Sequence, residues 1–426
     1  MYNIGNKLEA GKDMENLIPQ QAIDSVAQHI NQRNNKQYNI PTVGNDTNIE
    51  TPQIFEIIPF DQIDNTDLKV FAIDGSNNNH SFYNGVTIGL YRGGYVCFHS
   101  GKQIRLNNLN DPVILGQSYT PLNILITCDQ HLFSIYDELL TLPPVKRFLE
   151  FLQTPSDLDK IFPFKREAVC TTTSTLLSFC QEILEWSLIY EIACRTETKS
   201  GNFILRDGTL RSLNIKQEYL VKLGEFLSNE KRLVLVGITK NSPIKMELSY
   251  TFKQIDSYLQ DKLKPQYPFK QTDPKSQKLC CWFEVPDPVL LNAYGSGSMF
   301  VKKALTGGRG FGLFFAARLD YVEKLQNYDW VVADVNIFDA IPGIRQSNSA
   351  RNVDKLREIF YNLTRTTQEH YILGYPYPLV EAHNFVTLKA DFKEEIINRV
   401  KHSMYSTQHM DNVDIENMFL DIHSRF

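Results

Sequence analysis

The sequence lacks several features that would assign the protein to a specialised class. No apolar run approaches the roughly 20 residues that a membrane span needs, and residues 1–11 lack the apolar core of a signal peptide, so we expect a cytoplasmic protein without a membrane anchor. The seven cysteines form no CxxC pair, which argues against zinc and favours buried, reduced thiols. The net charge is −5, so any bound nucleic acid must be held by a local basic patch or a channel.

What is present suits a protein with a large core. Hydrophobic residues make up 42% of the 426 positions, enough for two or three structural units. Residues 1–50 predict an N-terminal helix, at about 14–33, followed by a polar linker rich in asparagine. We expect the main domain at 51–400, with a proline-punctuated insertion at about 100–168, and a helical tail at 401–426.

The periodicity of the first part of the main domain predicts an α/β fold. The expected elements are strands at 68–76, 85–92 and 94–99, a helix at 173–195, a strand ending at Asp207, a helix at 214–229 and a strand at 232–239. Gly93-Gly94 is a dipeptide suited to a hairpin turn, so it predicts a tight connection between the second and third strands. The order β-β-β-α-β-α-β predicts a mixed sheet flanked by helices, which is the order of ribonuclease-H-like folds.

The rest of the chain gives fewer signals. Residues 313–318 and 330–337 predict strands, residues 353–366 predict a helix, and a further helix is expected to begin near Pro378 and to run through His383.

Two aspartates stand at strand ends. Asp74 follows the apolar run Val70-Phe71-Ala72-Ile73, and Asp207 ends the strand that begins at Phe203. Each is followed by glycine and a hydroxyl residue, and Asp-Gly is a common turn dipeptide, so either motif alone fits a simple turn. Clustered carboxylates repel one another unless a divalent cation holds them together, which makes a metal site the alternative.

A third carboxylate lies on the expected helix at 173–195. Glu191 falls on the apolar stripe that contains Leu184 and Leu188, and a buried charge needs a partner. That partner is either Arg195, one turn away, or a metal ion shared with the strand aspartates. Glu185 is a further candidate for the same role.

His383 and a few cations complete the set of candidate residues. His383 lies about one turn into the helix that follows Gly374-Tyr375-Pro376-Tyr377, where a lone histidine is usually structural. Lys240, at a strand end, and Arg309, in the glycine-rich segment 307–312, are candidates for contacts with phosphate, as are Lys302 and Lys303. The glycine-rich segment has no following Lys-Ser/Thr and is therefore no Walker loop.

The combination of these motifs resembles the NurA nuclease family. The resemblance covers roughly residues 68–390, and the segment Tyr375-Pro376 to Ala382-His383 is its most specific part. It implies a fold similar to ribonuclease H and PIWI domains, a homodimer, and degradation of DNA ends with the hexameric ATPase HerA. It also implies that Asp74, Glu191 and Asp207 hold Mn²⁺ or Mg²⁺, with Tyr375 and His383 completing the site.

The sequence therefore predicts a two-metal deoxyribonuclease. We expect an end-processing exonuclease with single-strand endonuclease activity, working in DNA repair or anti-phage defence. The alternative is a catalytically inactive ribonuclease-H-like subunit that binds DNA or serves as scaffold for a translocase. A PIWI-like guided nuclease is a further alternative, although nothing in the sequence offers a domain that binds a guide end.

Overall fold

A computed structural model gives the fold. It describes residues 21, 24–28, 55–56, 68–81, 87–105, 122–128, 139–154, 158–161, 173–212, 214–263, 280–294, 312–319, 330–336, 353–368 and 374–407. Helical backbone at 21 and 24–28 falls within the predicted N-terminal helix, and the polar linker and residues 408–426 lie outside the described residues.

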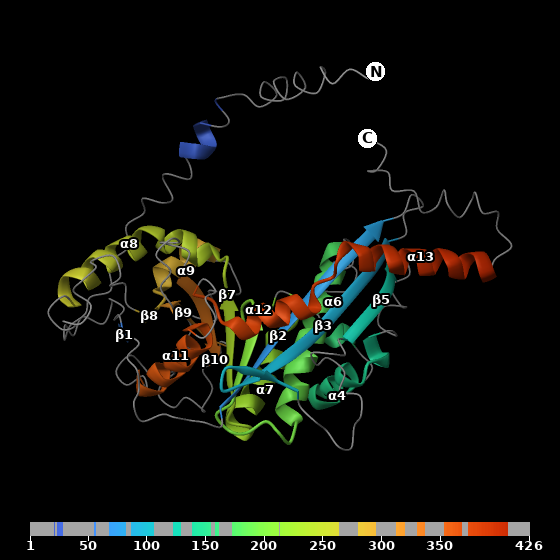
Figure 1. The fold of residues 1–426 in the computed structure, drawn as a ribbon, viewed down its shortest axis with the longest axis horizontal. Helices are drawn as coiled ribbons and strands as arrows, with labels where there is room; N and C mark the ends of the chain where they lie inside the picture. The colour runs from blue at the N-terminus through green and yellow to red at the C-terminus, as the bar shows by residue number, and fades with distance from the viewer. Residues whose placement is uncertain are drawn as a thin grey trace.

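The described strands form one mixed sheet (Figure 1). They are β1 (Phe55–Glu56), β2 (Lys69–Ser81), β3 (Thr87–His99), β4 (Lys102–Ile104), β5 (Leu122–Cys128), β6 (Phe203–Asp207), β7 (Val234–Thr239), β8 (Cys281–Glu284), β9 (Gly312–Arg318) and β10 (Trp330–Asn336). Their order across the sheet is β1-β8-β9-β10-β7-β6-β2-β3-β4, and β5 also pairs with β3. The pairs β2–β6 and β6–β7 are parallel and the others are antiparallel, so the predicted α/β class with a mixed sheet is confirmed.

The described helices connect and cover these strands. They are α4 (Pro143–Leu152), α6 (Thr173–Cys194), α7 (Gln217–Glu225), α8 (Pro243–Leu263), α9 (Asp287–Tyr294), α11 (Val353–Gln368), α12 (Tyr377–Val386) and α13 (Ala390–Thr407), with short turns η2 (Leu158–Lys160) and η3 (Phe226–Glu230). The helices predicted at 173–195, at 353–366 and from Pro378 through His383 are therefore present.

The second and third predicted strands are one strand, so the predicted turn at Gly93-Gly94 is wrong. Both glycines lie inside β3, where they pair with Gly75 and Asp74 of β2. A Cβ atom at Gly93 would lie 3.5 Å from Leu184 of α6, an ordinary van der Waals distance. A strand glycine can mark a close approach as well as a turn, and the sequence motif does not distinguish the two.

The segment predicted as an insertion supplies strands to the sheet. β4 and β5 both lie within 100–168 and pair with different parts of β3. The helix α4 from the same segment contributes Phe148 and Leu149 to the apolar core that includes α6. Four antiparallel strands, β2 to β5, thus precede α6, and the predicted order of elements is confirmed from α6 through β6, α7 and β7.

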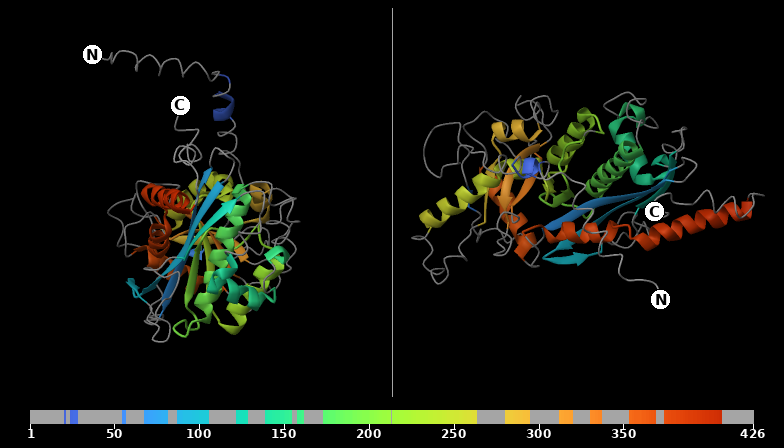
Figure 2. Two further views of the ribbon diagram at one scale, coloured as in Figure 1. Left: turned by 90° about the vertical axis from the view of Figure 1, so that its right-hand side faces the viewer. Right: turned by 90° about the horizontal axis from the view of Figure 1, so that it is seen from above.

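The sheet separates two apolar layers. Phe71 and Ile73 of β2 pack with α4, α6 and α7, whereas Val70 and Ala72 pack with α11 and α12 on the opposite face. Figure 2 shows the two groups of helices on opposite sides of the strands. Side chains alternate between faces along a strand, so Asp74 belongs to the face that α12 covers.

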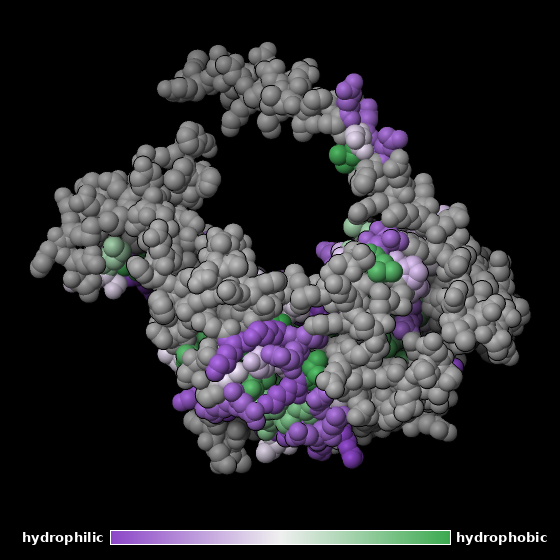
Figure 3. All heavy atoms as spheres, turned by 180° about the vertical axis from the view of Figure 1, so that it is seen from behind, coloured by the Kyte–Doolittle hydropathy of each residue, from purple (hydrophilic) through white to green (hydrophobic). Residues whose placement is uncertain are grey.

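The described part of the face opposite to that in Figure 1 is mostly hydrophilic. Figure 3 shows small, separate hydrophobic patches on its described part. Among the described residues, the exposed large hydrophobic side chains are Val26, Met246 and Tyr405. No described helix combines the length and the apolar character needed to cross a bilayer.

The segment that follows Asp207 crosses closely over β7. A Cβ atom at Gly237 would lie 2.4 Å from the carbonyl oxygen of Gly208 and 3.0 Å from the backbone nitrogen of Leu210. The backbone of Gly208 also donates a hydrogen bond to the Ile238 carbonyl, and Gly208 has a φ of 109°, which suits glycine. The absence of a side chain at Gly237 therefore allows the segment after β6 to pass this close to β7.

We expect Gly237→Ala to destabilise the protein by about 1–3 kcal/mol, because two backbone segments would have to separate. The matched change Gly93→Ala, whose new methyl group would make ordinary contacts with α6, should change stability by no more than about 0.5 kcal/mol. Urea denaturation of both variants checks this, and equal losses of stability would contradict the packing described for Gly237.

Candidate functional site

Asp74 lies inside β2, which continues to Ser81, so its predicted position at a strand end is wrong. Its carboxylate is held from two directions. Its Oδ1 accepts a hydrogen bond from the backbone nitrogen of Gly75 at 2.8 Å, and its Oδ2 lies 2.8 Å from Nδ1 of His383. The residue is 6% exposed. A charged group with so little contact with water needs such partners, because burial of an uncompensated carboxylate is unfavourable.

Asp207 lies beside Asp74 because β2 and β6 pair in parallel. The register joins Ile73 to Arg206, so the next residue on each strand is an aspartate. Asp207 is two residues beyond Leu205, which packs in the layer of α12, and alternation therefore places its side chain on that same face. Two carboxylates thus stand on adjacent strands on one face of the sheet.

His383 comes from α12, 309 positions after Asp74. Ligand atoms of Asp74, Asp207 and His383 all lie within 4.8 Å of one another. The side chain of His383 is 58% exposed, so the cluster can be reached from solvent on its side. The sequence analysis expected this histidine near the two aspartates, and the structure places it there.

The surroundings of Asp74 disfavour its ionised, negatively charged form. The pKa of Asp74 is raised from 3.8 to about 7, chiefly by burial and then by the charges of Glu185 and Asp207. Hydrogen bonds from His383 and from the backbone of Gly75 lower the same pKa and offset part of this effect. A cation in the cluster would relieve the repulsion.

Tyr375 supplies a hydrogen-bond donor to the cluster. Its side chain is buried and hydrogen-bonds with Asp207, and its hydroxyl lies 3.5 Å from the carbonyl oxygen of Ile238. Burial, together with the charge of Asp207, raises the pKa of Tyr375 well above 10. The hydroxyl therefore stays protonated and can donate to the carboxylate.

Glu191 lies away from the cluster, contrary to the prediction. Both of its carboxylate oxygens accept hydrogen bonds from Arg147 of α4, each at 2.9 Å. Arg195, the other predicted partner, forms an ion pair with Glu197 instead. The helix α6 is buried against both the sheet and α4, so a stripe of leucines on it does not identify the side that faces the aspartates.

Glu185 is the α6 carboxylate that faces the strands of the site. Its Oε1 would lie 2.7 Å from a Cβ atom at Gly75, so the absence of a side chain at Gly75 makes room for it. Glu185 and Glu191 are six residues apart, which at 100° per residue turns them about 120° from each other around the helix. Glu185, the further candidate on this helix, therefore lies closer to the strands of the site than Glu191 does.

Glu185 is neutralised by an arginine that the sequence analysis did not single out. Arg206 lies 2.6 Å from its Oε2, and Gln181 donates to its Oε1 at 2.9 Å. Arg206 also lies over the Trp186 ring, 4.9 Å from its centroid, and donates to the carbonyl of Thr209. In the sequence, the feature that marks Arg206 is its place inside a strand that is otherwise apolar before Asp207.

Asp334 is a second residue that the sequence analysis did not single out. It lies in the apolar strand β10, and its Oδ2 accepts a hydrogen bond from the backbone nitrogen of Leu210 at 3.0 Å. Arg211 lies 3.5 Å from the same oxygen and donates to the Gly312 carbonyl at 2.7 Å. Together these contacts fix the segment that leaves Asp207.

Among the predicted DNA-binding cations, Lys240 is described. It is exposed, and its Nζ lies 3.9 Å from the centroid of the Tyr375 ring, which places it beside the cluster. Lys302, Lys303 and Arg309 lie outside the described residues.

No protein-family model matches the chain, and no curated protein matches it.

The raised pKa of Asp74 predicts a pH dependence of stability. The folded protein retains a proton on Asp74 between about pH 4 and pH 7 that the unfolded chain has lost. The free energy of unfolding of the metal-free protein should therefore fall, on the order of 2 kcal/mol, as the pH rises through this window.

Urea denaturation in EDTA at pH 5 and pH 8 measures this slope. Asp74→Asn should remove most of it, whereas Glu191→Gln, which alters a carboxylate away from the cluster, should retain it. An unchanged slope in Asp74→Asn would contradict the electrostatic description of the site.

Proposed function

We propose that the protein is a metal-dependent deoxyribonuclease of the NurA type. The observation that carries the proposal is the convergence of Asp74, Asp207 and His383, from β2, β6 and α12, within 4.8 Å. Two carboxylates and an imidazole from three separate elements provide ligands for a divalent cation in a place that substrate can reach.

The strand order supports a ribonuclease-H-like fold. An antiparallel set of β3, β2 and the strands β4 and β5 is followed by the parallel strands β6 and β7, with α6 and α7 as the connecting helices. The expected ribonuclease H order has the same arrangement, and it brings the first and a later strand side by side. The candidate aspartates lie on that pair of strands.

The donor set fits a hard divalent cation. Two carboxylates and one imidazole suit Mn²⁺ or Mg²⁺ better than a thiolate-rich site would, and no described cysteine belongs to the cluster. The raised pKa of Asp74 reflects negative charges that a cation would stabilise. Asp74, Asp207 and His383 would hold such ions, which would supply a lowered pKa of an attacking water and stabilisation of the leaving oxygen of a phosphodiester.

The residues of the chain hold and orient the ligands. The backbone of Gly75 and the ring of His383 fix the two oxygens of Asp74, and Tyr375 fixes Asp207. His383 is exposed enough to contact substrate, where it either binds the second ion or transfers a proton to the leaving group. Lys240 contacts a substrate phosphate from its position above Tyr375.

The substrate and partners in the proposal follow from the resemblance to NurA. They are DNA ends, a second copy of the chain and a HerA-type ATPase, in repair or anti-phage defence. A net charge of −5 gives no general attraction to DNA, which supports delivery by a translocase. Lys302, Lys303 and Arg309 belong to the proposal as DNA contacts, although no structural observation bears on them.

One observation favours the alternative of an inactive DNA-binding or scaffold subunit. Glu185 is paired with Arg206, so two carboxylates and not three are available to ligands in the cluster. A nuclease assay separates the two functions.

We expect Asp74→Asn and Asp207→Asn each to abolish cleavage of linear single- or double-stranded DNA in Mn²⁺ while the protein stays folded. The asparagines retain the size of the side chain but remove the charge that binds metal. Glu191→Gln is the matched control and should retain activity, because its partner is Arg147. Absence of cleavage by the wild-type protein with either metal would favour the scaffold function, and activity in both aspartate variants would overturn the site.

We expect His383→Ala to fold normally and to cleave about 100-fold more slowly or worse, as for a lost ligand or acid. Circular dichroism and single-turnover kinetics check both parts. A loss of activity that merely parallels a loss of stability would assign His383 a structural role.

A further inference from the structure

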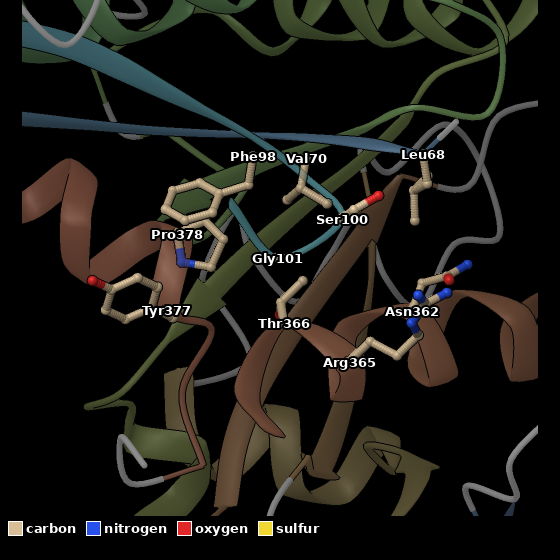
Figure 4. A pocket seen from close by; sticks show the side chains of 10 residues that line it. All are labelled: Leu68, Val70, Phe98, Ser100, Gly101, Asn362, Arg365, Thr366, Tyr377 and Pro378. Carbon is tan, nitrogen blue, oxygen red and sulfur yellow. The ribbon is translucent and has the colours of Figure 1, made fainter. Parts of the chain in front are cut away.

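A hollow lies between the sheet and the helices α11 and α12, away from the carboxylate cluster (Figure 4). Its cavity volume is about 50 Å³, which admits a small group such as a phosphate, and the space around it opens to solvent. Its lining residues are Leu68, Val70, Phe98, Ser100, Gly101, Asn362, Arg365, Thr366, Tyr377 and Pro378. Val70 is four residues before Asp74 on β2, which separates the hollow from the cluster by about 13 Å along the strand.

A buried amide borders the hollow. Asn362 of α11 is 2% exposed, and its Oδ1 has no hydrogen-bond partner in the part of the chain that the structure describes. Buried polar atoms are rarely left in this state, because loss of hydration without a replacement bond is unfavourable. A ligand with a hydrogen-bond donor would satisfy this oxygen.

The charge of the hollow is positive. Arg365 lies three residues after Asn362 on the same face of α11, and no described carboxylate forms an ion pair with it. No lining residue is acidic. The first turn of α12, at Tyr377 and Pro378, also borders the hollow, and Pro376 provides no side-chain cap for it. The positive end of the helix dipole adds to the attraction for an anion.

The opposite wall is apolar and aromatic. In the view of Figure 4, Phe98, Pro378 and Tyr377 lie on one side and Asn362 and Arg365 on the other. The rings of Phe98 and Tyr377 meet edge to face, with centroids 5.7 Å apart. The hollow thus offers a cationic, polar side and a flat apolar side to the same ligand.

We propose that this hollow binds a phosphomonoester of a nucleotide. The guanidinium of Arg365 forms paired hydrogen bonds with the phosphate, and the Oδ1 of Asn362 accepts a hydrogen bond from a hydroxyl or amino group of the nucleotide. The sugar or the edge of the base lies against the aromatic side. The phosphomonoester comes either from a free mononucleotide or from the terminal phosphate of a DNA strand. The site is independent of the proposed nuclease function.

Calorimetry on the full-length protein in EDTA tests the proposal, because it excludes binding through a metal. The probes are dAMP, deoxyadenosine and inorganic phosphate, together with a short oligonucleotide that carries or lacks a terminal 5′-phosphate. We expect dAMP to bind at least about tenfold more tightly than deoxyadenosine, since the nucleoside lacks the charge. Tighter binding of the phosphorylated oligonucleotide than of its unphosphorylated form identifies the strand end as the source. Binding of dAMP without that difference identifies the free nucleotide.

Matched variants locate the site. Arg365→Gln should weaken the binding of dAMP about tenfold or more, whereas Arg399→Gln, at an exposed arginine of α13, should leave it unchanged. Asp74→Asn should also leave it unchanged, because Asp74 belongs to the carboxylate cluster. Equal binding in Arg365→Gln and the wild type, or no binding of dAMP at millimolar concentration, would overturn the proposal.

Asn362→Leu provides a second test. Replacement of a buried amide without a partner by an apolar side chain of similar size should maintain or raise the melting temperature. The binding of dAMP should nevertheless weaken. A lower melting temperature together with unchanged binding would show that Asn362 serves packing and would contradict its assignment to the ligand.

Discussion

The parallel pairing of β2 with β6 is the constraint on which the rest of the site depends. Its register places Asp74 next to Asp207, although they are far apart in the sequence, and strand alternation turns both toward α12. Two carboxylates in this position destabilise one another unless donors or a cation compensate them. Gly75, His383 and Tyr375 supply the donors.

The sheet also separates charges of different roles. On the α6 side, Arg206 and Gln181 bind the two carboxylate oxygens of Glu185. The negative charge of Glu185 raises the pKa of Asp74, although the two residues share no ligand. On the α12 side, His383 is exposed to solvent and lies beside the buried Asp74. Arg206 of β6 therefore pairs with Glu185 on one side of the sheet. Asp74, Asp207 and His383 on the other side can bind a cation.

The start of α12 links two parts of the molecule. Tyr375 lies against Asp207, while Tyr377 and Pro378 border the hollow near Arg365. The prolines at 376 and 378 restrict the backbone between them, so the position of this segment is defined by few torsions. The same short segment therefore serves both the carboxylate cluster and the second, cationic hollow.

The sequence by itself determined the order of the elements from α6 through β7 and the position of Asp207 at the end of β6, because these follow from local periodicity. It did not determine that Asp74 lies inside β2, which continues to Ser81, because an Asp-Gly dipeptide occurs in turns and within strands. The tertiary structure decided which carboxylate of α6 faces the strands: Glu185 and Glu191 differ by the rotation of one helix, and that rotation depends on contacts with α4 as well as the sheet. It also decided that Gly93-Gly94 lies inside a strand, because glycine permits both a turn and close packing. The contact between His383 and Asp74 likewise depends on how α12 packs across β2, a contact over 309 positions that no local pattern encodes.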